Sequence, residues 1–342
     1  MSPLVSVGMP VYNGAAHLAD SIQSVCVQSF PDWELIVLDD CSTDDSRTVA
    51  EGFRDPRIRV MSTDRNGGLV AARNRLVAEA RGEFIAWLDQ DDLAAPSRLA
   101  MQVAYLTTHR EVAVLGTWTT RFSQRADGTR HSQRIATPVG AAAIRSFTLM
   151  GNPFYCHTVM MRRSIFANDG FGFREWTGNA LDYDLWSRLA DDHVLDCLPR
   201  TLAQYRVHEH QNSQGAGGRA IAERAWEIQQ ETLARTLHID IAGVPDHPHR
   251  RLADEPAEVA DAADLAERAQ WLRELDERNQ VHRAYPRQSL RRVLANRWAF
   301  SLLGAHRRGI SPLGPALRSP VTGWLPGEGV ALLGRRLRAR AG

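Results

Sequence analysis

Over its first hundred residues the chain alternates short apolar, β-branched runs with segments whose apolar residues recur at helical spacing. Leu18, Ile22 and Val25, for example, share one face of a helix between two such runs. Strands that alternate with helices form βαβ units, in which helices cover a parallel sheet. The predicted strands are 4–9, 33–38, 58–62 and 84–88, and the predicted helices are 15–28, 42–53, 69–80 and 96–109. The sequence therefore predicts an α/β fold with a mostly parallel sheet and flanking helices.

The rest of the chain changes from mixed structure to helix. Further strands are predicted at 112–118, 154–161 and 201–207, with a polar loop or hairpin over 122–133 and a helix that begins near Leu181. Beyond a glycine-rich stretch at 214–218, helices are predicted at 219–237, 256–279 and 288–306, with a proline-rich linker over 244–256. We therefore expect a catalytic domain over residues 1–215 and a helical C-terminal extension over 216–342.

Composition excludes several classes of protein. All 41 basic residues are arginine, so neither a P-loop nor a Schiff-base lysine is possible. The net charge of +1 gives no indication of a polyanionic partner, because a protein that binds nucleic acid usually carries a clear basic excess, and no nucleic-acid partner is predicted. The four cysteines show no C-x-x-C spacing, which disfavours a structural zinc site. With no signal peptide at Met1 and no long apolar run, the catalytic body is expected in the cytoplasm.

Carboxylates follow two of the predicted strands. Asp39 and Asp40 end one strand, and Asp89-Gln90-Asp91 ends another. Ligands of open α/β sheets bind at this edge, and alternating carboxylates there can hold a divalent cation that bridges two phosphate oxygens. The alternative is an acidic turn that caps the next helix, a role that suits Asp92.

Four motifs resemble the inverting family 2 glycosyltransferases, and the resemblance covers roughly residues 3–213. The motifs are residues 7–13, 38–44, 66–74 and 82–92, and the family usually has glycine at the position of Cys41. The resemblance implies a GT-A-like fold that binds a nucleotide-diphospho-sugar, here a UDP-sugar, with Mn²⁺ or Mg²⁺ as cofactor. It also implies a glycan or lipid-linked acceptor, in the assembly of a bacterial surface polysaccharide or glycolipid.

The same resemblance assigns the donor-binding residues. Asp39 matches a carboxylate that accepts the imide N–H of uracil, and Asp40 would lie nearer the ribose or the phosphates. For Asp40 the alternative is a charge that stabilises a helix N-terminus, and for Arg73 it is an exposed surface position. The implied donor-binding residues are Pro10, Tyr12, Asn13, Asp39, Asp40, Asn66, Arg73 and Asp89.

Asp182 takes the position of the family's general base, which removes the proton of the acceptor hydroxyl. The family usually has an acid where this chain has Leu181. Asp184 would face away on a helix and is interpreted as structural. Trp176 and Tyr183 could stack on an acceptor sugar, although aromatic residues more often lie in a core.

Asp91, Asp89 and His208 are the implied metal ligands. His208 and the following Ser213 resemble the family's closing strand, whose histidine can complete the metal shell or contact the diphosphate. The alternative for His208 is a hydrogen-bonded polar residue without a ligand role.

Three other functions remain as rivals. A nucleotidyltransferase would carry a glycine-rich phosphate loop with a basic residue after the first strand, and residues 9–14 contain none. A catalytically inactive sugar-nucleotide or polysaccharide-binding module could lose its acidic residues, yet Asp89, Asp91 and Asp182 are present. A dehydrogenase would need a G-x-G-x-x-G motif.

The C-terminal tail is basic and amphipathic. From Arg287 to Gly342 there are eleven arginines and one acid. Such segments bind anionic bilayers, which favours peripheral contact with the inner face of the membrane. The alternative is that the apolar face packs within the protein. The predicted apolar face consists of Leu290, Val293, Leu294, Trp298 and Leu302. The arginines that flank it are Arg287, Arg291, Arg292 and Arg297. Further along the tail come Leu332, Leu333, Arg335, Arg336, Arg338 and Arg340.

Overall fold

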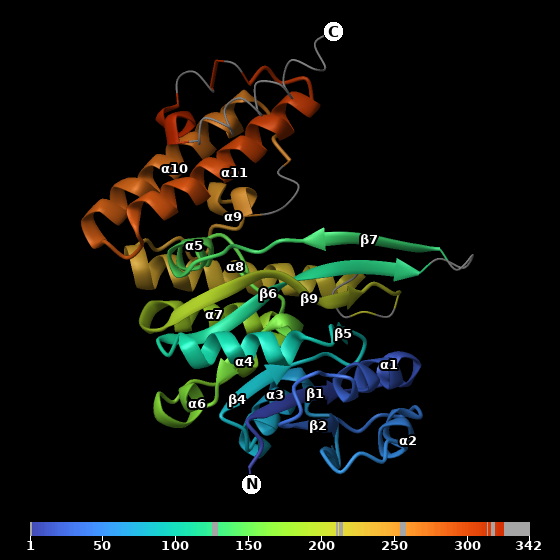
Figure 1. The fold of residues 1–342 in the computed structure, drawn as a ribbon. Helices are drawn as coiled ribbons and strands as arrows, with labels where there is room; N and C mark the ends of the chain where they lie inside the picture. The colour runs from blue at the N-terminus through green and yellow to red at the C-terminus, as the bar shows by residue number, and fades with distance from the viewer. Residues whose placement is uncertain are drawn as a thin grey trace. The chain divides into compact units, whose positions relative to one another are not determined.

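The first strand, β1 (Val5–Val11), is buried along its whole length because it lies between two others. It pairs in parallel with β2 (Trp33–Asp39) and with β4 (Phe84–Trp87). β3 (Ile58–Ser62) pairs with β2, again in parallel. The predicted parallel βαβ arrangement is confirmed in the computed structural model, which describes residues 2–124, 129–209, 211, 215–253, 258–312, 314, 315 and 319–324 (Figure 1).

Beyond β4 the sheet becomes mixed. Its order is β3-β2-β1-β4-β8-β6-β9-β5, and β7 pairs with β6. β6 is parallel to β9, whereas β8 runs antiparallel to β4 and β6, and β5 runs antiparallel to β9. The strands concerned are β5 (Leu93–Ala94), β6 (Val112–Gln124), β7 (Arg130–Ile135), β8 (Met160–Arg162) and β9 (Val194–Arg206). The polar stretch after 122 is therefore the end of a hairpin, β6 with β7, one of the two possibilities predicted.

Helices pack against this sheet through the faces that the sequence indicated. Leu18, Ile22 and Val25 of α1 are buried in one core cluster together with β1 and with Leu99 and Leu106 of α4. The helical elements here are α1 (Ala15–Cys26), α2 (Ser46–Glu51), α3 (Gly68–Glu79), α4 (Arg98–Thr108), η1 (Cys156–Thr158), α6 (Ser164–Asn168), η2 (Glu175–Ala180) and α7 (Leu181–Asp192). The strand predicted at 154–161 is wrong over most of its length, because the 3₁₀ turn η1 occupies its middle.

The chain divides into two compact units, which we describe separately. The first comprises residues 1–141 and 152–225, and the second comprises 142–151 and 226–342. The division at 226 falls inside a helix, α8, later than the boundary expected from the glycine-rich stretch. The helices of the second unit are α5 (Ala141–Phe147), most of α8 (Gly215–Leu237), α9 (Pro248–Ala253), α10 (Ala262–His282), α11 (Arg287–Arg307) and the 3₁₀ turn η3 (Pro320–Trp324). The linker predicted over 244–256 is wrong in part, because α9 lies within it, while 254–256 fall outside the described residues.

The apolar face of α11 lies inside the core of the second unit. Leu290, Leu294, Trp298 and Leu302 are each fully buried, together with residues of α8 and α10. Arg297 is also buried, whereas Arg287 and Arg292 are exposed. The alternative prediction, that the apolar face packs within the protein, is therefore confirmed for α11. The arginines outside this face are the ones left for contact with a membrane. Leu332, Leu333, Arg335, Arg336, Arg338 and Arg340 lie outside the described residues. In the described part of the chain no helix has both the length and the apolar content to cross a bilayer.

Candidate active site

The site is built on the loop 89–92, at the C-terminal end of β4. Gln90, the middle residue of the acidic motif, bridges this loop to the end of β1: its Oε1 accepts the Tyr12 N–H at 2.8 Å, and its Nε2 donates to the Tyr12 carbonyl at 3.1 Å. The bridge needs a glycine beside it, because a Cβ on Gly14 would lie 2.4 Å from Gln90 Cδ. The middle residue therefore fixes the loop, so that the carboxylates on either side of it are held in place.

Arg73, on α3, holds the first carboxylate of the motif. Its Nη2 lies 2.6 Å from Asp89 Oδ1, and its Nη1 donates to Cys156 Sγ at 2.9 Å. Its guanidinium carbon lies 4.9 Å from the ring centroid of Trp87, and the residue is 2% exposed. The interpretation of Arg73 as a surface arginine is therefore wrong, because its charge is buried beside Asp89.

Asp182 lies in the first turn of α7 and interacts electrostatically with the same arginine. Its Oδ2 accepts a hydrogen bond from Asn152 Nδ2 at 3.0 Å, and its Oδ1 accepts the Tyr183 N–H at 2.8 Å. Burial raises the pKa of this carboxyl above its ordinary value, while Asn152 and Arg73 oppose the rise. A carboxylate with a raised pKa is a better proton acceptor than an exposed one, which suits a general base.

Asp91 and His208 lie together, as predicted from two distant motifs. Asp91 Oδ2 is 2.9 Å from His208 Nε2, and the Asp91 carbonyl accepts a hydrogen bond from Arg206 Nε at 2.9 Å. The His208 ring centroid lies 4.8 Å from that of His17, whose pKa is lowered by burial and then by Arg206. A carboxylate and an imidazole that are already adjacent offer oxygen and nitrogen ligands of the kind that divalent cations accept.

Asp92 is the residue whose role the sequence did not reveal. It is fully buried, with its Oδ1 accepting the Arg206 N–H at 2.9 Å and its Oδ2 lying 2.9 Å from His157 Nδ1. His157 Nε2 is 3.0 Å from Thr119 Oγ1. Burial raises the pKa of Asp92 to about 6, and His157 opposes this rise. The interpretation of Asp92 as a helix cap is wrong, because α4 begins only at Arg98.

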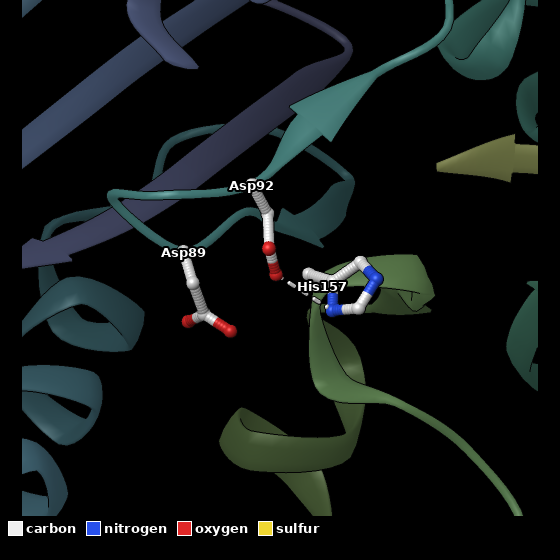
Figure 2. Close-up of side chains that lie close together, drawn as sticks. All are labelled: Asp89, Asp92 and His157. Carbon is white, nitrogen blue, oxygen red and sulfur yellow. Dashed lines mark ion pairs between the residues drawn. The ribbon is translucent and has the colours of Figure 1, made fainter. Parts of the chain in front are cut away.

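Asp89, Asp92 and His157 form a second cluster that could hold a cation. Their ligand atoms lie within 4.8 Å of one another, and Figure 2 shows Asp89 and Asp92 on one loop, with Asp92 directed at His157 and Asp89 beside it. Within this cluster, however, Asp92 and His157 are paired with each other and with buried polar groups, and Asp89 is paired with Arg73. A cation there would have to displace the partners of Asp92 and His157, which are both buried, and this costs more than opening the partly exposed pair of Asp91 and His208.

The carboxylates after β2 differ in their contacts. Asp39 accepts the Ser42 N–H at 3.3 Å. Asp40 accepts the N–H groups of Gly67 and Gly68 at 3.0 and 2.8 Å, at the start of α3. Asp40 therefore stabilises a helix N-terminus, the alternative considered for it, although the helix is α3 and not α2, the next along the chain.

The remaining predicted donor residues lie beside these carboxylates. Asn13 has a φ of 50°, and its Oδ1 accepts the Thr43 N–H at 2.8 Å. Asn66 Oδ1 accepts the Gly68 N–H at 3.1 Å. Pro10 is buried within β1, and Tyr12 is exposed. Both asparagines thus stabilise loop backbone with their side-chain oxygens, and all three of Tyr12, Asn13 and Asn66 are exposed to solvent.

Cys41 stands in a backbone conformation that favours glycine. Its φ is 62°, in the left-handed region that glycine enters at no steric cost. This explains physically why a glycine is common at this position in the family that the sequence resembles.

The residues after the base divide between the core and the surface. Asp184 is fully buried and pairs with Arg174 and Arg188, as expected for a structural residue. Tyr183 is 2% exposed, so the prediction that it could stack on an acceptor sugar is wrong. Trp176 is 37% exposed and is available for such a contact. Ser213 lies outside the described residues.

Comparison with known proteins identifies the family. The Glycosyl transferase family 2 model matches residues 6–170. The chain is 38% identical to the Bacillus subtilis protein named as glycosyltransferase EpsE, over 56% of this chain and 68% of EpsE. It is 36% identical to the same organism's TuaG, named for teichuronic acid biosynthesis, over 67% of this chain and 86% of TuaG. The Escherichia coli glucosyltransferase WfgD is 27% identical, over 71% and 95%.

Solved structures show the same fold. TarS residues 1–349 of S. aureus, in complex with UDP-GlcNAc, match with a TM-score of 0.53 at 20% identity, over 91% of this chain and 93% of that one. The mannosyltransferase PcManGT of Pyrobaculum calidifontis, with GDP-Man and Mn²⁺, matches with a TM-score of 0.51 at 19% identity, over 100% and 86%. The predicted GT-A-like fold is confirmed, and the two relatives above 30% identity show that this chain is a glycosyltransferase that belongs to family 2.

Proposed function

We propose that this enzyme transfers a sugar from a UDP-sugar to a hydroxyl of a glycan or lipid-linked acceptor, with inversion at the anomeric carbon. The observation that carries the proposal is the arrangement around Arg73: this buried guanidinium pairs with Asp89 and interacts electrostatically with Asp182. One buried guanidinium thus contacts a donor-side carboxylate and acts electrostatically on the candidate base. The residues proposed to act lie within 1–215, which we propose as the catalytic domain, with 216–342 as its helical extension.

Asp182 acts as the base. The acceptor hydroxyl loses its proton to the Asp182 carboxylate while its oxygen forms a bond to the anomeric carbon. The bond from that carbon to the diphosphate breaks, and its electron pair leaves with the diphosphate. Because each Asp182 oxygen accepts a single protein hydrogen bond in the contacts given above, each keeps a lone pair for this proton. One displacement from the opposite face gives a β product from an α-linked donor.

Asp91, Asp89 and His208 would hold the divalent cation, Mn²⁺ or Mg²⁺. When bound, such a cation neutralises charge that develops on the leaving diphosphate. Two members of this set, Asp91 and His208, are adjacent and partly exposed, as a binding site requires. Asp89 is not grouped with them in the described residues: its carboxylate lies with Asp92 and His157 and pairs with Arg73, so Asp89 would have to exchange this partner to join the cation. Arg73 fixes the position of the Asp89 carboxylate, and Gln90 ties the loop to the end of β1.

The names of similar proteins support the donor and acceptor classes. WfgD is named for transfer from UDP-Glc to a GlcNAc-diphosphoundecaprenol acceptor, and TuaG for teichuronic acid biosynthesis. TarS binds UDP-GlcNAc. We therefore propose a role in assembly of a bacterial surface polysaccharide or glycolipid. A lipid-linked acceptor would favour a peripheral position at the inner face of the membrane, through arginines of the C-terminal tail.

A panel of nucleotide sugars tests the activity, with nucleotide release measured in Mn²⁺ or Mg²⁺. With the preferred donor, Asp182→Asn is expected to lower kcat by about 10²–10⁴-fold, the usual contribution of a positioned base, and to leave UDP affinity near that of the wild type. The matched control is Asp192→Asn, the same chemical change at the exposed last residue of the same helix, which should leave kcat unchanged. An NMR analysis that shows a retained anomeric configuration would overturn the single displacement.

A further inference from the structure

A polar cavity lies on one face of the β6/β7 hairpin. In the strand register Arg121 lies opposite Gln133, and Ser123 lies opposite His131. Because alternate residues of a strand point to the same face, these four side chains share one face of the sheet. Together with Phe122 and Val207 they line a cavity of about 100 Å³. Arg121, His131 and Gln133 are exposed.

On the same face of the sheet, contacts between aromatic side chains connect this cavity with His157. Arg121 also lies opposite Tyr205 of β9. The Tyr205 ring centroid is 5.7 Å from that of Tyr155 and 5.6 Å from that of His157, with which it stacks. Tyr155 is 36% exposed, and His157 belongs to the cluster with Asp89 (Figure 2). Exposed aromatic surface thus lies between the cavity and the side of the loop that carries Asp89.

We propose that this cavity binds an anionic group, a carboxylate or a phosphate, on the glycan acceptor. The inference rests on the proposed function and names a feature of its acceptor. A sugar ring that contacts Tyr155 and Tyr205 would place its charged substituent in the cavity and direct the rest of the acceptor towards Asp182.

The chemistry of the lining favours an anion. Arg121, Ser123, His131 and Gln133 all offer hydrogen-bond donors, and none of the lining residues that the structure describes is acidic. In the part of the chain that the structure describes, Arg121 forms no ion pair, so its planar fork can bind a carboxylate or phosphate through two hydrogen bonds.

The opposite face of the hairpin differs and supplies a control. There Arg130 lies over the Phe122 ring, with 3.9 Å from its guanidinium carbon to the centroid, and Arg134 lies over the Trp118 ring at 5.2 Å. These arginines are exposed and belong to the same strand pair, but they do not line the cavity. Arg134→Gln therefore removes the same charge from the same hairpin without touching the proposed subsite.

The test is calorimetric titration of the full chain, saturated with UDP and Mg²⁺ to fill the donor site, with three probes. Methyl β-D-glucuronide carries a carboxylate, glucose 6-phosphate carries a phosphate, and methyl β-D-glucoside is neutral. We expect at least one charged probe to bind about tenfold more tightly than the neutral one, as a charge-assisted hydrogen bond would give. The tighter charged probe identifies the anion.

Arg121→Gln should abolish that preference, and Arg134→Gln should keep it. Equal affinity for the three probes, a preference that survives Arg121→Gln, or a preference lost equally in both variants would overturn the subsite. UDP affinity is measured first in each protein. This measurement separates a failure of the anion subsite from a failure of the proposed function. If the wild type does not bind UDP, the donor assignment fails, and the comparison of the probes still decides whether the cavity binds an anion.

Discussion

Two aspartates of one loop each pair with a histidine, at the same distance and in opposite surroundings. Asp91 Oδ2 lies 2.9 Å from His208 Nε2, and Asp92 Oδ2 lies 2.9 Å from His157 Nδ1. The side chains of the first pair are 19% and 24% exposed, whereas those of the second are 1% and 2% exposed. A partly exposed pair can exchange its partner for a ligand, but a buried pair that loses a member leaves a charge without compensation. Burial, and not the type of residue, therefore separates the pair proposed for binding from the pair that supports the fold.

The largest effect should come from breaking the buried pair. His157→Ala leaves the Asp92 carboxylate buried without its partner, and we expect a loss of about 3–5 kcal/mol in the free energy of unfolding. His208→Ala is the matched control and should change stability by less than about 1 kcal/mol, because its partner can reach water. Urea unfolding followed by circular dichroism measures both. Equal losses in the two variants would show that burial does not distinguish the pairs.

Of the residues in these two pairs, the sequence predicts the aspartates that follow a strand more readily than the histidine that reaches them from a distant segment. Asp89, Asp91 and the parallel strands before them follow from local patterns, since a buried run that ends in carboxylates is visible in the chain itself. His157 carries no such signal. It reaches Asp92 only because a 3₁₀ turn interrupts an apolar segment that was interpreted as one continuous strand.

Asp40 and Arg73 show the same limit in another way. Each was assigned to the donor, with a structural or surface alternative, and the choice depends on contacts between distant segments. Asp40 accepts hydrogen bonds from backbone N–H groups at the start of α3, and not from those of α2, the helix that follows it in the chain. Arg73 is buried by Trp87 and Cys156, neither of which is close to it in sequence. Helical periodicity places a residue on a face, but it does not show what covers that face.

The exposed pair should determine metal-dependent binding of the nucleotide. Asp91→Ala is expected to reduce UDP affinity in the presence of Mn²⁺ by at least about 10–100-fold, the loss seen even for residues that only orient a metal ligand. Its thermal unfolding should stay close to that of the wild type, because the side chain is partly exposed. Calorimetry with and without Mn²⁺ measures the effect. Unchanged UDP affinity with metal present would remove Asp91 from the metal site.

Asp182 combines features of the buried pair and of the exposed pair. Its side chain is partly exposed, and burial nevertheless raises its pKa. A base works only when deprotonated, so activity is lost as the pH falls through its pKa. A raised pKa places this loss at a higher pH than for an ordinary aspartate, whose pKa is about 3.9. The acidic limb of the kcat/KM profile reports the group in the free enzyme. Asn152→Ala should move that limb to still higher pH, because the hydrogen bond from Asn152 lowers the pKa of Asp182. A limb that stays in place in Asn152→Ala would contradict this origin of the shift.

The smallest expected effect concerns the C-terminal arginines, where burial again decides what is available. The apolar face of α11 is enclosed in the second unit, so this face is not available to insert into a bilayer. The arginines outside it would contribute about 1 kcal/mol each near an anionic surface. Arg335, Arg336, Arg338 and Arg340 supply four such charges close together.

Flotation with anionic and neutral liposomes, at low and high salt, measures this contact. We expect the full chain to float with anionic liposomes at low salt only, because salt screens exposed charges over a Debye length of about 8–10 Å. Replacing the four tail arginines with glutamine should abolish flotation, whereas Arg292→Gln on the exposed side of α11 should weaken it only slightly. Removing the tail from Asn279 onward would not be a fair test, since it deletes a helix that forms part of the core. Flotation that persists at high salt would indicate an apolar contact that the buried face of α11 does not provide, and no flotation at low salt would show that the arginines do not bind membranes.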